Sequence, residues 1–202
     1  MKTLISELEE ERISELSAYL KVSRLDSYEL SIEERKALED FNNIKWREYN
    51  LEKLFGKATR GRRLKSQDRL KGVLPFVTAG EANTGISDFI GNDVKIFNKN
   101  TITIDMFGSA KYRNYNYGCD DHIAVVHTEN LKMEESIFIT SAIHKTSYNG
   151  QFNYGRNFYA KDADTLNILL PINEKGIDYD FMNSLISAVQ KLVIKDVVIY
   201  AD

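Results

Sequence analysis

The hydrophobic pattern of this chain changes near Trp46, and that change limits the folds open to it. Before Trp46, apolar residues recur mostly at three- and four-residue steps: Leu4, Leu8, Ile13, Leu16 and Leu20. Such spacing gathers apolar side chains on one face of an α-helix. After Trp46, short apolar runs are separated by glycine-marked loops, which is typical of short strands. Because the pattern has no βαβα alternation, it favours an α+β fold.

Further helices are expected at both ends of the chain. Ser31-Ile-Glu-Glu34 has the form of a capping box and predicts a second helix that carries Ala37, Leu38 and Phe41 inward. The narrow apolar stripe of the first helix needs a partner surface. That partner is either another chain or subunit, in a coiled-coil-like pairing, or this protein's own domain.

The C-terminal segment predicts a helix that begins at Asp178 or Asp180 and has a broad apolar face. Residues 197–200 are a candidate for a last strand. Residues 133–143 could be strand or helix, and we favour helix. Other strands are expected at 73–78, 94–97, 101–105, 123–126 and 166–170. We therefore expect a helical spacer or assembly segment at 1–45, followed at 46–202 by a mixed twisted sheet with flanking helices.

Composition excludes several classes of protein. The 202 residues suffice for one large domain and a helical appendage, and two prolines provide no disordered linker. No run approaches the roughly 18 apolar residues of a membrane span. The N-terminus turns acidic at once, unlike a secretory signal. The lone Cys119 cannot form an internal disulfide. We expect a cytoplasmic protein without a membrane partner.

Positive charge is concentrated in two segments, although the net charge is −3. Residues 57–72 contain seven Lys and Arg against Asp68 alone, and residues 144–161 contain three and no acid. Such segments commonly meet a phosphate backbone. A solvated helix face or loop is the alternative explanation for the first segment taken by itself.

The stretch 72–90 joins the first basic segment to a polar loop. Its apolar run at 73–77 predicts a core strand in which Pro75 and Phe76 have structural roles. The strand leads into a loop at 78–85 that contains Thr78, Asn83 and Gly85. A strand that delivers a polar loop beside a cationic segment can present side chains to a charged polymer.

Two further loops have a similar character. Residues 106–118 include Lys111, Tyr112, Arg113 and Asn114, which we expect to project from a glycine-marked loop. In residues 144–161, aromatic side chains are interleaved with amides and cations. Asn and Gln can bond adenine bidentately, Arg can bond guanine, and Lys suits phosphates. The alternative is an ordinary polar loop whose aromatics pack inward, foremost Phe152 and Phe158.

These features predict a nucleic-acid interface built from three loops and a basic approach. The candidate DNA-binding residues are Arg60, Arg62, Arg63, Lys65, Thr78, Asn83, Lys111, Tyr112, Arg113, Lys145, Tyr148, Asn149, Gln151, Asn153 and Arg156.

The order of short motifs from Trp46 onward resembles a known family. The motifs are Trp46…Leu54-Phe55, the basic segment, Gly72-Val-Leu-Pro-Phe-Val-Thr, Asn83-Thr-Gly85-Ile, Phe97…Asn100-Thr-Ile-Thr, Met106-Phe-Gly108, Phe152…Tyr154-Gly155-Arg156 and Leu169-Leu-Pro171. Together they resemble a target-recognition domain of the specificity (S) subunits of type I and related type IIB restriction–modification systems. The resemblance covers roughly residues 46–195.

The resemblance implies sequence-specific binding of double-stranded DNA by a subunit that is not itself catalytic. Its partners would be a DNA methyltransferase subunit and often a nuclease subunit. Family members usually carry two recognition domains separated by long paired helices, and each domain binds half of a split target. Since this chain contains one such domain, we expect pairing with a second copy or a second recognition domain. A half-sized subunit and a fragment of a longer one remain alternatives.

Two other functions compete with this hypothesis. The first is a protein-interaction or scaffold module that uses the N-terminal helices. The second is a metal-dependent nuclease centred on Asp105, Asp120 and Asp121, beside His122. Consecutive residues of a strand point to opposite faces, which makes a poor shared site. His127, His144 and Cys119 are expected to be structural, and no cofactor is expected.

Overall fold

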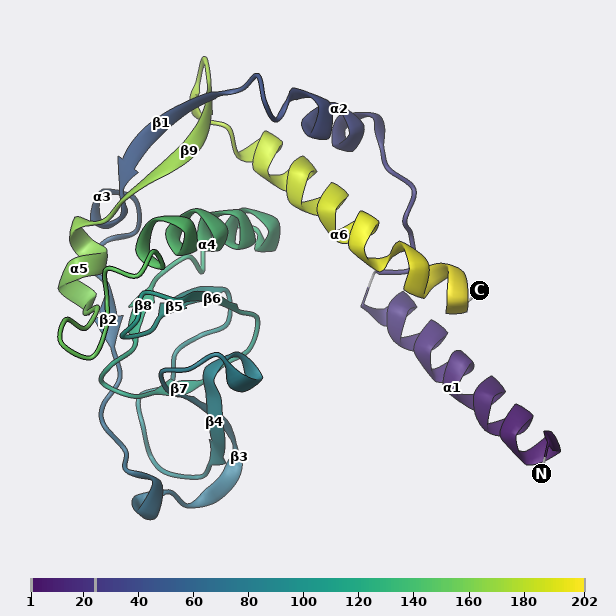
Figure 1. The fold of residues 1–202 in the computed structure, drawn as a ribbon, viewed down its shortest axis with the longest axis horizontal. Coiled ribbons are helices and arrows are strands. Elements are labelled where there is room, and N and C mark those ends of the chain that lie inside the picture. The colour runs from purple at the N-terminus through teal and green to yellow at the C-terminus, as the bar shows by residue number, and fades with distance from the viewer. Residues whose placement is uncertain (1, 24, 202) are drawn as a thin grey trace. The chain divides into compact units, whose positions relative to one another are not determined.

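The computed structural model describes residues 2–23 and 25–201, which form two compact units (Figure 1). One unit contains the chain up to Ile44 together with the segment from Asp180 onward, and the other is Lys45–Tyr179. The C-terminal helix therefore groups with the N-terminal helices, whereas the expected division placed it with the strands. The α+β class is confirmed.

The helical unit contains α1 (Lys2–Val22), α2 (Ile32–Asp40) and α6 (Tyr179–Ala201). Leu20 of α1 is buried against Val198 and Ala201 of α6, with Ile194 packed beside them. These α6 residues recur at helical spacing, so the apolar run 197–200 continues the helix. The strand expected there is wrong, because the run buries one face on α1 and not two faces in a sheet.

The capping box at the start of α2 is confirmed. The Ser31 backbone N–H donates to Glu34 Oε2 at 2.7 Å, and Ser31 Oγ accepts the Glu34 backbone N–H at 3.2 Å. Ala37 is buried as expected, but Phe41 lies one residue beyond the helix and is exposed. Glu34 also accepts hydrogen bonds from Ser187 at 2.5 Å and Lys191 at 2.9 Å, so its carboxylate joins α2 to α6.

The second unit contains three small sheets and several short helices (Figure 1). In spatial order, the sheets are β1 (Lys45–Asn50), β9 (Asn167–Asn173) and β10 (Gly176–Ile177); β2 (Thr59–Arg60), β8 (Ala124–Val126), β5 (Thr101–Ile104) and β6 (Ala110–Arg113); and β4 (Ile86–Ile90), β3 (Lys71–Val77) and β7 (Gly118–Cys119). The helices are α3 (Leu51–Phe55), α4 (Met133–Ser147) and α5 (Ala160–Thr165), with 3₁₀ turns η1 (Ser66–Asp68) and η2 (Ala82–Gly85). Only β3 and β7 pair in parallel among these strands.

Helix α4 packs against both β6 and β9 and so lies between two of the sheets (Figure 1). Its residues Ile139 and Ile143 are fully buried, and the ring of Phe138 stacks on Trp46 of β1 at 6.3 Å. The helix expected at 133–143 is thus confirmed, and it supplies the apolar layer on which the short strands rest.

Two details of the strands differ from expectation. Residues 94–97 form no strand, because only Phe97 bridges to another segment, through paired backbone hydrogen bonds with Tyr117. In β3, Phe76 and Val77 are buried but Val73 is 90% exposed. An irregular register between Lys71 and Leu74 turns Val73 outward, so the core part of the strand is shorter than predicted.

Glu34→Gln should destabilise the helical unit, because the carboxylate accepts two hydrogen bonds from α6 and one from a backbone N–H. We expect the free energy of unfolding at pH 7 to fall by about 1–3 kcal/mol. Urea titration followed by circular dichroism would measure the loss. The exposed neighbour Glu39 offers a matched control, and Glu39→Gln should change stability by less than about 0.5 kcal/mol.

The same contacts predict that the stability of the helical unit depends on pH. Burial raises the pKa of Glu34, but hydrogen bonds from Ser187, Ser31 and Lys191 lower it overall from its ordinary value of 4.5. The stabilisation should be present above pH 4.5 and lost as pH falls through the lowered folded value. If the difference in free energy of unfolding between wild type and Glu34→Gln were the same at acid pH as at pH 7, the ionised Glu34 carboxylate would not be the source of the stabilisation.

Candidate nucleic-acid interface

At Gly61, the backbone of the first basic segment crosses very close to the backbone of Cys119. A Cβ atom at Gly61 would lie 1.7 Å from the Cys119 carbonyl oxygen, so only glycine permits this approach. Cys119 itself is buried, and burial raises its pKa to about 12. The thiol is therefore protonated at neutral pH and fills space, as expected for a structural cysteine.

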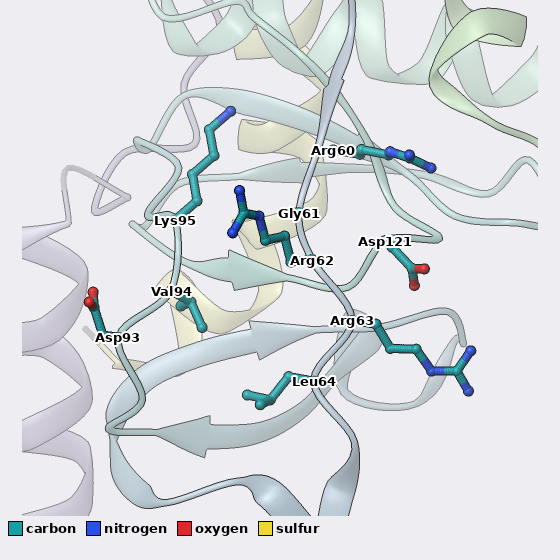
Figure 2. A pocket seen from close by; sticks show the side chains of 9 residues that line it. All are labelled: Arg60, Gly61, Arg62, Arg63, Leu64, Asp93, Val94, Lys95 and Asp121. Carbon is teal, nitrogen blue, oxygen red and sulfur yellow. The ribbon is translucent and has the colours of Figure 1, made fainter.

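Around this crossing lies an open hollow of about 1040 Å³, here called the basic hollow and shown in Figure 2. Its charged lining residues are Arg60, Arg62, Arg63, Lys95, Asp93 and Asp121. In Figure 2, Arg62 extends toward Lys95, whereas Arg60 and Arg63 extend from the opposite side of the segment, where Asp121 lies on a neighbouring loop.

The four cations of the basic hollow are exposed and free to bind an external anion. Within the described residues, none of them forms an ion pair with a carboxylate. Lys95 was not among the predicted residues. Its ammonium lies 4.6 Å from the centre of the Phe97 ring, which anchors this irregular segment. Lys65 is also exposed in the same basic segment.

The second candidate element is the loop of residues 78–86, here called the 78–86 loop. Thr78 donates its backbone N–H to the Gly85 carbonyl at 2.9 Å and closes the base of the loop. Asn83 and Thr84 have positive φ values of 48° and 54° and lie on its exposed part. The Asn83 amide forms no hydrogen bond with the described residues, so both its donor and its acceptor are available.

The cations expected to project from 106–118 lie on strand β6 instead. Lys111 contacts Glu81 at 3.2 Å and Ser109 at 2.8 Å. Arg113 is only 1% exposed and donates to Thr103 at 2.9 Å. The prediction that Arg113 projects toward DNA is therefore wrong, because the alternation of β6 directs it into the protein.

Tyr112 points to the other face of β6. Its hydroxyl donates to Asn100 Oδ1 at 2.9 Å, and burial raises its pKa. It lines a separate hollow of about 700 Å³ with Asn98, Lys99, Asn114 and Asn116. This hollow and the basic hollow share no lining residue, so Tyr112 lies apart from the basic hollow.

The third candidate segment follows α4. Lys145 lies in the last turn of this helix, and Tyr148 contacts the ring of His144 at 4.8 Å. Phe152 and Phe158 are buried against each other at 4.9 Å, which confirms that these aromatics pack inward.

The amides of this segment are partly used in local turns. Asn149 donates to the Thr146 carbonyl and accepts the Gln151 backbone N–H, each at 3.2 Å. Asn153 Oδ1 accepts the backbone N–H groups of Gly155 and Arg156. Their side chains are nevertheless exposed, as is Arg156, whose guanidinium lies 5.2 Å from the Phe152 ring.

The acidic cluster next to the basic hollow comprises Asp120, Asp121 and His122, whose candidate ligand atoms lie within 4.8 Å of one another. Asp105 is not part of it, because its carboxylate accepts backbone N–H groups of Phe107 and Ser109. Burial and the neighbouring Asp121 raise the pKa of Asp120. Burial also raises that of Asp121, but Asp120, His122 and Arg63 lower it overall. The cluster therefore holds negative charge beside Arg63.

Sequence comparison finds a similar protein with a known role. The chain is 23% identical over 161 residues to the type II restriction enzyme BgcI specificity subunit S.BcgI of Heyndrickxia coagulans, covering 78% of this chain and 47% of that protein. The chain thus spans about half the length of this curated relative.

Solved structures share the fold over nearly the whole chain. The type I restriction–modification S subunit from M. genitalium superposes with a TM-score of 0.56 at 14% identity, covering 96% of this chain and 53% of that one. The HsdS subunit from Thermoanaerobacter tengcongensis gives 0.50 at 14% identity, with coverages of 99% and 50%.

The family model for the type I restriction modification DNA specificity domain matches residues 43–197, which include every loop described above. The chain belongs to this DNA specificity domain family.

Proposed function

We propose that this chain is a sequence-specific DNA-recognition subunit that directs a methyltransferase or restriction complex to a target half-site. The observation that carries the proposal is the basic hollow, where Arg60, Arg62, Arg63 and Lys95 gather and form no ion pair with any described residue. Exposed cations in this arrangement suit the closely spaced phosphates of DNA.

In this proposal affinity and specificity come from different residues. The cations of the basic hollow, with Lys65 and Lys145, contact phosphates and fix the position of the duplex. Exposed amides and Arg156 contact base edges, with Asn83 on the 78–86 loop and Gln151 on the segment after α4. Lys111 and Arg113 support the loops from within.

The proposed partners are double-stranded DNA, a DNA methyltransferase subunit and, in a restriction complex, a nuclease subunit. These partners perform the chemistry, and this chain contributes recognition without a cofactor. Family membership and the S.BcgI relative support this role. The expected place of action is the cytoplasm; no helix among the described residues is long and apolar enough to cross a membrane.

We further propose that the helical unit pairs with a second copy or a second recognition domain. Helices α1 and α6 keep apolar side chains exposed, including Leu4 and Leu8 on α1 and Leu192 and Val193 on α6. Leu192 and Val193 precede Ile194 directly and therefore lie on another side of α6 than the Leu20–Val198 cluster, which leaves them available to a partner. Pairing would bring together the two half-sites of a split target.

Binding to a target duplex should weaken steeply with salt if the basic hollow contacts phosphates. With about six phosphates neutralised, affinity should fall about 10³-fold or more between 50 and 200 mM salt. Fluorescence anisotropy of the complex with its methyltransferase subunit would measure this slope. Binding that is absent or insensitive to salt would reject the proposal.

Reversing two cations should separate DNA recognition from scaffolding. Arg62→Glu with Arg63→Glu should abolish DNA binding because it places negative charge against phosphates, yet leave assembly with the partner subunit intact. Lys53→Glu with Lys175→Glu is the matched control, since both lysines are exposed outside the basic segments. If the Arg variant and the control bind DNA and assemble with the partner subunit alike, the basic hollow is incidental and the interaction-module hypothesis, which uses the N-terminal helices, is favoured.

Exchanging residues 72–160 for those of a related chain should change the methylated DNA motif. The exchanged span contains the 78–86 loop and the segment after α4, which carry the proposed base contacts. Sequencing of methylated sites after co-expression with the methyltransferase subunit would detect the change. Retention of the original motif would place base recognition elsewhere in the chain.

A further inference from the structure

Two cations of β6 contact the underside of the 78–86 loop. Lys111 and Arg113 are two residues apart and therefore lie on the same face of the strand. Lys111 donates to Glu81 at 3.2 Å, and Arg113 Nη1 approaches Thr84 Oγ1 at 3.5 Å. Both ends of the loop's exposed part are thus connected to one strand.

The 78–86 loop has a backbone that needs such support. Asn83, Thr84 and Gly85 have consecutive φ values of 48°, 54° and 83°. A left-handed conformation is rare for a β-branched residue such as Thr84 and persists only where surrounding structure holds it. A Cβ atom on Gly85 would lie 2.9 Å from the Thr78 carbonyl and 3.2 Å from that of Gly80, so this position requires glycine.

Arg113 is held rigidly from the interior side. Its Nε donates to Thr103 Oγ1 and its Nη1 to the Tyr115 hydroxyl, both at 2.9 Å. The guanidinium carbon lies 5.9 Å from the centre of the buried Tyr117 ring. Because the guanidinium is planar and has fixed donors, these contacts also fix the donors that face the loop.

The buried charge of Arg113 has no carboxylate partner among the residues that the structure describes. A buried cation is costly unless neutral acceptors satisfy its donors. Thr84 is one of those acceptors, and Gly85 covers Nη2, which would lie 3.6 Å from a Cβ atom at that position. The cation and the loop therefore depend on each other for their geometry.

We infer that Arg113 is a positioning residue that determines base preference without touching DNA, by fixing the 78–86 loop and the direction of Asn83. The inference rests on the proposed DNA-recognition function. It separates specificity from affinity, because the phosphate-binding cations of the basic hollow lie on other segments. Bidentate recognition of a base tolerates displacements of only about 0.5 Å, so loosening the loop should relax base choice.

Thr84→Ala and Arg113→Lys test the connection from its two ends. The first removes the loop hydroxyl, and the second keeps the charge but loses the planar fork. Both should reduce discrimination against wrong bases by about 5- to 150-fold at the positions that the loop contacts. The salt slope should stay unchanged, because no phosphate contact is lost. Competition binding with single-base variants of the target measures discrimination, and methylated-site sequencing with the partner subunit identifies the affected positions.

A control and a second measurement separate positioning from general destabilisation. Ile168→Val, in the buried part of β9, should lower stability but leave base preference intact. Hydrogen exchange of the 78–86 amides should accelerate about 10-fold or more in Thr84→Ala and Arg113→Lys, but not in Ile168→Val. If Arg113→Lys fails to fold, Thr84→Ala decides by itself.

The outcomes distinguish this inference from the proposed function. A wild-type complex that binds DNA selectively, with variants of unchanged preference or unchanged loop exchange, would overturn the inference alone. Failure of the wild-type complex to bind DNA would overturn the proposed function and the inference with it. Equal loss of preference in Ile168→Val would also overturn the inference, because it would indicate a general effect of stability.

Discussion

One apolar cluster holds together strands that are too short to be stable alone. It contains Val77, Phe97, Tyr117, Cys119, Ile123 and Val125, and so joins two of the three sheets. Tyr117 is fully buried, stacks on Phe97 at 5.6 Å and shares a 2.9 Å hydrogen bond with Thr101. Every segment around the basic hollow departs from this cluster or passes it. The positions of the exposed side chains therefore depend on a core to which β3, β7 and β8 contribute one residue each.

The polar groups next to this core divide into buried and exposed sets. Asp105 binds backbone N–H groups, among them that of Gly80 in the 78–86 loop at 3.3 Å, while Arg113 contacts the other end of the loop. Buried charges with fixed partners give rigidity. Among the described residues, the cations of the basic hollow have no such ion-pair partners and stay exposed. Buried charged groups thus hold the loop in place, whereas exposed cations remain available to an external anion.

Sequence alone predicted the features that depend on local spacing. The capping box at Ser31, the helix expected at 133–143 and the α+β class each follow from residues close together in the chain. The predictions that failed concern residues whose positions depend on contacts between distant segments. Phe97 is held by a single bridge to Tyr117, so no strand forms around it. Arg113 resembles a loop cation in sequence, and only the pairing of β6 with β5 shows that it faces the interior. For the same reason Lys95, distant in sequence from Arg62, could not be predicted as its neighbour.

The hydrogen bonds of the loops also narrow which amides can contact a base bidentately. Such a contact to adenine uses both the donor and the acceptor of one amide. Asn149 already forms one hydrogen bond with each group in a local turn, and Asn153 Oδ1 accepts two backbone N–H groups, which leaves Asn153 as a donor toward guanine or thymine. Asn83 keeps both groups available within the described residues, and it occupies a backbone conformation supported by buried charge. Of the three asparagines, Asn83 therefore has the amide best suited to base contact in the proposed function.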